Sequence, residues 1–236
     1  MIHSHQNKKT WQKKIHRFIA LSNFSKSKFI EAGFSSDKIS VKPNFVQDPY
    51  QGAQFERPVN FNGHALYLGR LNQEKGILRL VRAWKKMNFP LHIAGSGPLL
   101  KQIENEQSEN VTLLGHLDQA EKDEALRNAR FLILPSESYE GFPVVVAEAY
   151  AHGLPILASR IGSLQELIVD QKTGVHFAVD DELDLQTKAN TLFHSKELLS
   201  KMNSECRAHY ETYFSAGVNF RSLMNIYRAT LDNLVK

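Results

Sequence analysis

The sequence predicts an α/β protein built on a doubly wound parallel sheet, with a helical C-terminus. Short apolar runs alternate with amphipathic runs from residue 64 to about residue 180. Several of the apolar runs show little internal alternation, as strands covered on both faces should. The segments between them are short, which is typical of β-α units in series. These three observations together predict the fold class.

The first fifth of the chain predicts a small β-α-β segment. Residues 17–22 and 38–43 have the composition of strands, and residues 26–32 predict a short helix that ends at Gly33, a typical C-cap residue. Residues 47–63 are rich in Gln, Asp, Pro, Gly and Asn and have no periodicity. We therefore expect a linker between this segment and the main sheet.

Six strands with intervening helices are expected after the linker. Asp118 is the expected N-cap of one of these helices. The chain from about residue 181 to residue 234 is expected to be helical. The strands are predicted at residues 65–69, 91–94, 110–114, 131–134, 155–158 and 174–179, and the helices at 76–87, 98–107, 118–128, 143–152 and 163–169.

The composition is that of an ordinary globular chain, with 236 residues of which 42% are hydrophobic and 23% charged. It excludes a disordered or collagen-like protein. No apolar run approaches the ~18 residues of a membrane-spanning helix. The single cysteine, Cys206, excludes an internal disulfide framework and a zinc site of two or four cysteines. It suits a reducing, cytoplasmic location.

The positive charge is concentrated at the N-terminus. Residues 1–50 contain nine Lys and Arg against three acidic residues, and because the whole chain carries +4, the remainder carries about −2. This predicts an anionic partner such as a lipid surface, or else a solvated helix face. Trp11, Ile15 and Phe18 have helical spacing, which indicates either an interfacial helix or, preferably, a stripe packed on a further domain. Nucleic acid is not expected, because no aromatic platform accompanies the basic residues.

Ligands of such a sheet bind at the carboxyl ends of the strands, where several glycines and charged residues fall. Arg70 and Lys75 lie between a predicted strand and the helix that follows, and two cations beside a helix N-terminus form an anion site. The alternative is a surface loop with incidental charges. The next loop contains Gly95 and Gly97 in a tight turn, which permits close approach of a ligand to the backbone.

A pair of glutamates marks a third loop. Glu140 stands just before a predicted helix and Glu148 lies within it, so that two carboxylates could hold two diols of one extended ligand. The alternative is a capping Glu140 and a solvated Glu148. The run around Glu148 looks buried, so we expect its carboxylate to have a partner. Pro143 suits the first helical position, and three amides there would be unpaired donors: those of Gly141, Phe142 and Val144.

These motifs resemble those of retaining nucleotide-sugar glycosyltransferases of the GT-B fold, family 4 type. The resemblance rests on Gly-Arg-Leu-(x)3-Lys-Gly, then Gly-x-Gly-Pro, then Glu-Gly-(x)6-Glu, in order and in consecutive βα loops. It covers residues 64–180 well and residues 15–46 more loosely. Phe45 and Ser163 depart from it, because the family commonly has glycine at both positions.

The resemblance implies roles for these residues. Arg70 and Lys75 would contact the donor diphosphate and stabilise it as it leaves, Glu140 and the following amides would hold the sugar, and Glu148 would bind the ribose. No metal is implied, and no cofactor beyond the UDP- or GDP-linked donor. The implied catalytic residues are Arg70, Lys75 and Glu140; the implied substrate-binding residues are Gly69, Gly95, Gly97, Gly115, His116, Leu117, Gly141, Phe142, Pro143, Val144 and Glu148.

The resemblance also implies a domain division. Family 4 enzymes have two Rossmann-like domains, and this chain resembles the second domain together with the last strand and helix of the first. We therefore expect a remnant of the N-terminal domain at 1–47, a linker at 48–63, and a Rossmann-like donor-binding domain with C-terminal helices at 64–236. We expect either that the chain is a fragment without the rest of the first domain, or that a partner chain supplies that part.

The predicted function is transfer of a hexosyl group, with retention, from a nucleotide-diphosphate sugar to a glycan or lipid-linked acceptor. We expect it to serve cell-envelope polysaccharide synthesis, in the cytoplasm or peripherally at the inner face of the membrane. One alternative is a non-catalytic nucleotide-sugar-binding subunit completed by a partner chain. Another is a sugar-nucleotide epimerase of the same fold, for which the necessary extra carboxylates and histidine cannot be placed.

Overall fold

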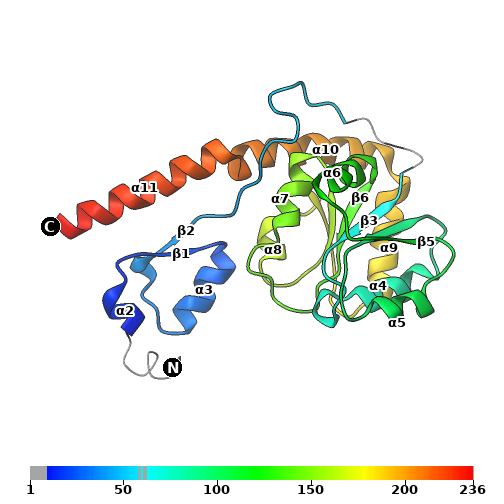
Figure 1. Ribbon diagram of the computed structural model, residues 1–236, viewed down its shortest axis with the longest axis horizontal. Helices are drawn as coiled ribbons and strands as arrows, with labels where there is room; N and C mark the ends of the chain where they lie inside the picture. The colour runs from blue at the N-terminus through cyan, green and yellow to red at the C-terminus, as the bar shows by residue number, and fades with distance from the viewer. Residues whose placement is uncertain (1–9, 58–59, 61–62, 236) are drawn as a thin grey trace.

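A computed structural model describes residues 10–57, 60 and 63–235, and its centre is a parallel sheet of six strands (Figure 1). The strand order is β5-β4-β3-β6-β7-β8, so the chain moves outward in one direction from β3, then returns to the middle and moves the other way. This is the doubly wound order that the sequence predicts. The strands are β3 (Ala65–Leu68), β4 (Leu91–Ala94), β5 (Val111–Gly115), β6 (Phe131–Leu134), β7 (Ile156–Ser159) and β8 (Gly174–Phe177).

Every helix predicted between these strands is present, and the C-terminal region is helical as expected. The predicted ends differ from the observed ones by three residues or fewer. Asp118 caps its helix as predicted. Its side chain accepts a hydrogen bond from the Glu121 amide, and the Glu121 side chain accepts one from the Asp118 amide. The helices are α4 (Ile77–Trp84), α5 (Leu100–Glu106), α6 (Gln119–Asn128), α7 (Val144–Ala151), α8 (Leu164–Leu167), α9 (Glu182–His194), α10 (Lys196–His209) and α11 (Ala216–Val235), with a 3₁₀ turn η2 (Gln73–Lys75) and a π-helical turn η3 (Tyr210–Phe214).

The sheet is buried on both faces because its strands carry apolar residues at successive positions. In β3, Ala65 and Tyr67 pack into the cluster that α4, α5 and α9 cover, whereas Leu66 packs into the cluster that α6 and α7 cover. Side chains of a strand point alternately to its two sides, so each strand contributes to both clusters. The two faces of the sheet therefore hold separate cores.

The N-terminal part forms a second, two-stranded parallel sheet. Its elements are α2 (Thr10–Lys14), β1 (Phe18–Ala20), α3 (Asn23–Glu31), η1 (Ser36–Lys38) and β2 (Ile39–Val41). The expectation of one helical stripe through Trp11, Ile15 and Phe18 is wrong, because α2 ends at Lys14 and Phe18 begins β1. Pairing with β2 holds Phe18 extended, and its ring packs edge-on against Phe34. Part of the basic N-terminal run, including Lys8 and Lys9, lies outside the described residues.

Helix α11 connects the two parts by running from the main sheet toward β1 and β2 (Figure 1). Asn219 near its start accepts a hydrogen bond from Lys42 Nζ at 2.9 Å and donates one to the Pro43 carbonyl at 2.6 Å. Within the described ranges, no helix is long and apolar enough to cross a membrane.

Arg57, from the segment that joins the two parts, holds two helix ends together. Its guanidinium donates to the carbonyls of Leu126 and Ala129 at the end of α6 and to the carbonyl of His152 at the end of α7, at 2.6–2.9 Å. Burial lowers the Arg57 pKa to about 10, and the side chain stays charged at neutral pH. Terminal helix carbonyls lack partners within the helix, so a cation there is favourable.

We expect Arg57→Met to lower the free energy of unfolding by about 2–4 kcal/mol, since three hydrogen bonds to a charged donor are lost and carbonyls are left unpaired. Urea denaturation followed by circular dichroism measures this. The matched control is Arg127→Met, on an exposed α6 arginine without a hydrogen bond or ion pair among the described residues. Equal stability of the two variants would contradict the role given to Arg57.

A pair of stacked histidines lies at the opposite end of the sheet from the strands' carboxyl ends. The rings of His64 and His92 are 3.6 Å apart and nearly parallel. His64 is 8% exposed, and among the residues that the structure describes its Nε2 has no hydrogen-bond partner. Burial, with a smaller contribution from His92, lowers the His64 pKa from 6.5 to about 4.

This predicts a loss of stability in acid. Because the folded-state pKa of His64 lies below its unfolded value, the unfolded chain binds more protons below pH 6.5. The stabilisation is complete above pH 6.5 and is lost as the pH falls to about 4, by about 3 kcal/mol for this residue. The free energy of unfolding, measured by denaturation at several pH values from 7 to 4, should fall less with decreasing pH for His64→Phe than for the wild type. His194→Phe, at an exposed histidine, is the control and should behave as the wild type does. An unchanged slope in His64→Phe would exclude this residue as a source.

Candidate functional site

The site lies where the chain reverses direction across the sheet. Strands β3 and β6 are neighbours, yet α4, which follows β3, packs on one face, and α7, which follows β6, packs on the other. The loops after these strands therefore diverge and leave a crevice between them, where ligands of doubly wound sheets bind. They stay joined at their base, where the Glu137 amide donates to the Glu74 carbonyl at 2.9 Å.

A cavity of about 440 Å³ occupies this crevice. Its walls come from the loops after β3, β4 and β5 and from one side of α6 and α7. Among its lining residues are Ser96, Lys122 and Val145, which the sequence analysis did not single out. Six of the predicted site residues line it: Gly69, Arg70, Gly95, His116, Leu117 and Glu148.

Glycines let the backbones of these loops touch. Gly95 has φ +145°, and a Cβ there would lie 1.8 Å from the Gly69 carbonyl oxygen. A Cβ at Gly97 would lie 2.4 Å from the Leu71 carbonyl oxygen, and Gly115 has φ +71°. The sequence shows such glycines only as possible tight turns, whereas the structure shows contact between neighbouring loops.

The two predicted cations have different surroundings. Arg70 is exposed, and among the described residues no acceptor pairs with its guanidinium. Its carbonyl accepts a hydrogen bond of 2.8 Å from the buried Tyr67 hydroxyl, which fixes the backbone of the loop. Lys75 forms an ion pair with Glu140, and Ser136 Oγ donates to the same carboxylate at 2.8 Å. Lys75 and Glu140 do not line the cavity of about 440 Å³ but join the two loops beside it.

The start of α7 is open in the way the sequence predicts. The prediction of Pro143 at the first helical position is wrong by one residue, because its backbone is extended (φ −66°, ψ 117°) and it is the N-cap residue, so the helix begins at Val144. Among the described residues, no acceptor takes the amide hydrogens of Gly141, Phe142 and Val144. The Phe142 side chain points away into the core, where its ring packs edge-on against Phe214. Phe142 therefore offers a ligand only its backbone.

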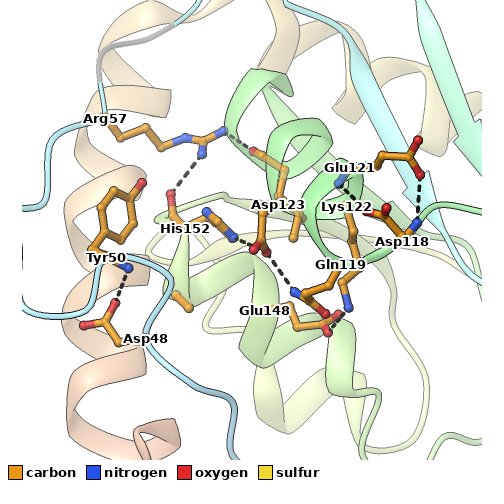
Figure 2. Close-up of polar contacts among 12 residues, drawn as sticks. Asp48, Tyr50, Arg57, Asp118, Gln119, Glu121, Lys122, Asp123, Glu148 and His152 are labelled. Carbon is orange, nitrogen blue, oxygen red and sulfur yellow. Dashed lines mark hydrogen bonds and ion pairs between the residues drawn. The ribbon is translucent and has the colours of Figure 1, made fainter.

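Glu148 has the partner that its buried surroundings require. Lys122 Nζ lies 2.5 Å from Glu148 Oε1, and the pair joins α6 to α7 (Figure 2). Both side chains are mostly buried, at 24% and 19% exposed. Sequence reasoning predicted a partner but could not identify it, because the two residues lie 26 positions apart on helices that only the tertiary fold brings together.

Behind this pair, a polar chain runs along α6 (Figure 2). Gln119 donates to Asp123 at 3.0 Å, and the same Asp123 oxygen lies 3.2 Å from His152 Nε2. His152 is 2% exposed, and its burial lowers the pKa to about 4 against the opposing effect of Asp123, so the ring is neutral at pH 7. Since the ring is neutral, this contact is a hydrogen bond and not an ion pair.

The N-terminal part reaches the site through the start of α3. Ser22 Oγ donates to the Gly141 carbonyl at 3.0 Å. Glu166, in α8, accepts hydrogen bonds of 2.8–2.9 Å from the Asn23 amide and side chain and from the Phe24 amide. These contacts fix the loop between Glu140 and α7 from outside the main sheet.

No cluster of three or more metal-ligating side chains occurs among the described residues. The charges that converge on the crevice come from Arg70, Lys75, Lys122, Glu140 and Glu148. Cations together with unpaired amides suit an anionic ligand, and carboxylates suit its hydroxyl groups.

We expect Gly95→Ala to disturb the cavity, because its Cβ would overlap the Gly69 carbonyl and its φ is unfavourable for alanine. The free energy of unfolding should fall by more than about 1 kcal/mol. The control is Gly217→Ala, where the nearest atom to the new Cβ is a side-chain nitrogen at 3.6 Å. Thermal denaturation of both variants measures this, and equal melting temperatures would contradict it.

Known proteins resemble this chain in sequence and in fold. The family described as "Glycosyl transferases group 1" matches residues 60–209. An uncharacterized glycosyltransferase of Methanocaldococcus jannaschii is 34% identical over 137 residues, which are 56% of this chain and 39% of the relative. Glycogen synthase of Mycobacterium tuberculosis is 36% identical over 135 residues, 53% of this chain and 32% of that enzyme. The chain thus spans about two-fifths or less of the length of these two relatives.

A solved structure agrees with the fold. HepE of Anabaena, in complex with UDP, superposes with a TM-score of 0.80 over 91% of this chain and 64% of that one, at 18% identity. The likeness extends to the N-terminal part, because it covers most of the chain. Since the family match also includes more than half of the residues, the chain belongs to the group 1 glycosyltransferases, and its six-stranded sheet is the Rossmann-like domain of the GT-B fold.

Proposed function

We propose that this chain is the donor-binding half of a retaining hexosyltransferase of family 4 type, which uses a UDP- or GDP-linked sugar. The observation that carries the proposal is the cavity at the crossover of the sheet, with the cation Arg70 on one wall and the carboxylate Glu148 on another. A nucleoside diphosphate has an anionic end and a ribose diol, and it matches these two groups. The Anabaena relative, whose structure contains UDP, supports the same ligand class.

In this proposal the residues beside the cavity act on the sugar end of the donor. Arg70 and Lys75 stabilise the charge that develops on the diphosphate as its bond to the anomeric carbon breaks. The acceptor hydroxyl forms the new bond to that carbon, and its proton leaves with the diphosphate. Glu140 and the unpaired amides of Gly141, Phe142 and Val144 hold the sugar. Retention of configuration is proposed from the family resemblance alone.

The proposed reaction needs no metal, because two cations and the start of α7 supply positive charge at the diphosphate. The acceptor is a glycan or a lipid-linked acceptor, in cell-envelope polysaccharide synthesis. We place the enzyme in the cytoplasm or at the inner membrane face, where exposed Lys13 and Lys14 of α2 would meet anionic lipid.

A second candidate function is a donor-binding subunit that is inactive alone and is completed by a partner chain. The exposed apolar residues of the N-terminal part favour it, since Ile19, Phe29 and Ile30 are each 37–45% exposed. A pull-down that recovers a second Rossmann-like chain, whose addition restores transfer, would distinguish it from the first.

The proposed function is tested by calorimetric titration of the full chain with UDP, GDP, ADP and the corresponding nucleotide sugars. We expect the nucleotides of one base to bind with a micromolar dissociation constant. Glu148→Gln should weaken that binding by about 1–3 kcal/mol, because a charged hydrogen bond to the ribose is lost. Arg70→Ala should weaken the binding of the nucleoside diphosphate more than the binding of the corresponding nucleoside, because only the diphosphate carries the charge that Arg70 contacts.

The matched control for Glu148 is Glu106→Gln. Glu106 is also ion-paired, with Arg82 at 2.8 Å, and its side chain is 24% exposed, but it lies outside the cavity. Its variant should bind as the wild type does. If no nucleotide binds, or if both glutamate variants weaken binding equally, the crevice is not the donor site.

A further inference from the structure

Lys122 faces the same cavity as Glu148 and is a second charged group at its α6–α7 wall. The capping box at Asp118 fixes the start of α6, and the Lys122 amide donates to the Asp118 carbonyl at 3.0 Å in the first helical turn. The backbone of Lys122 is therefore held firmly. Its ammonium points across to α7 and meets Glu148 (Figure 2).

The pair leaves bonding capacity on both partners. Lys122 carries three N–H groups, of which one reaches Glu148 Oε1. The other carboxylate oxygen, Oε2, has no hydrogen-bond partner among the residues that the structure describes. The cavity wall thus presents a donor and an acceptor side by side.

A vicinal diol fits such a pair better than a carboxylate alone would. A hydroxyl both donates and accepts, whereas a carboxylate only accepts and an ammonium only donates. One ribose hydroxyl can donate to Glu148 Oε2 while its neighbour accepts from Lys122 Nζ. Neither contact requires the 2.5 Å ion pair to break.

We propose that Lys122 is a specificity-determining residue that reads one ribose hydroxyl of the bound nucleotide and so selects ribonucleotides over deoxyribonucleotides. This rests on the proposed function, which places the ribose at Glu148. It assigns to α6 a direct contact with the ligand, in addition to tying α6 to α7. If the ion pair had only a structural role, breaking it would lower the stability of the fold but would not change the preference for ribonucleotides over deoxyribonucleotides.

The test is a double-mutant cycle in which one change removes the Lys122 side chain and the other removes a ribose hydroxyl from the ligand. Wild type, Lys122→Met and Lys122→Arg are titrated with UDP, 2′-deoxy-UDP and 3′-deoxy-UDP, or with the GDP series if that base binds. For one of the two deoxy ligands, the wild type should bind the ribonucleotide about tenfold more tightly. In Lys122→Met this ratio should fall to about one, and Lys122→Arg should restore most of it.

Lys86→Met is the control, since Lys86 pairs with Glu182 at 3.5 Å and does not line the cavity. It should keep the wild-type ratios. The inference is overturned, and the donor site stands, if the wild type binds a ribonucleotide and Lys122→Met has the same two ribonucleotide-to-deoxyribonucleotide affinity ratios as the wild type. If wild type binds no nucleotide, the proposed function fails and this assignment fails with it.

Discussion

The arrangement of the site depends on backbone contact between loops at the crossover of the sheet. Gly76 has φ +66°, and a Cβ there would lie 1.9 Å from the Pro135 carbonyl oxygen, so the loop after β3 lies directly on the loop after β6. Gly95 brings the loop after β4 equally close to Gly69. Only glycine permits such approach, and no side chain separates the loops. The positions of Arg70, Lys75 and Glu140 all follow from these contacts.

The fold could be predicted because its signals are local. Six apolar runs with helices between them are visible along the chain, and Asp118 caps its helix through neighbours three residues away. The same reasoning failed at Trp11, Ile15 and Phe18, where helical spacing occurs by chance across the end of α2 and the start of β1. There the pairing of β1 with β2, which is not local, decides the backbone conformation.

The site was predicted less completely for the same reason. Loop residues such as Gly69, Arg70 and Gly95 could be found, because βα loops of one sheet share one edge. Lys122 gave no such signal, since it lies within a polar helix and its role comes from packing against α7. The burial of the Phe142 side chain against Phe214 was equally hidden, because Phe214 belongs to the distant turn η3.

The contact between Ser22 and the Gly141 carbonyl links two parts of the chain that are far apart in sequence. Gly141 lies directly between Glu140 and the start of α7, and α3 is fixed at the same point through Glu166. A ligand that favoured this loop position would therefore also favour the docked position of α3, by the free energy that couples the two. Such linkage is reciprocal, so a molecule that changed how α3 docks would change the affinity of the crevice by the same coupling free energy.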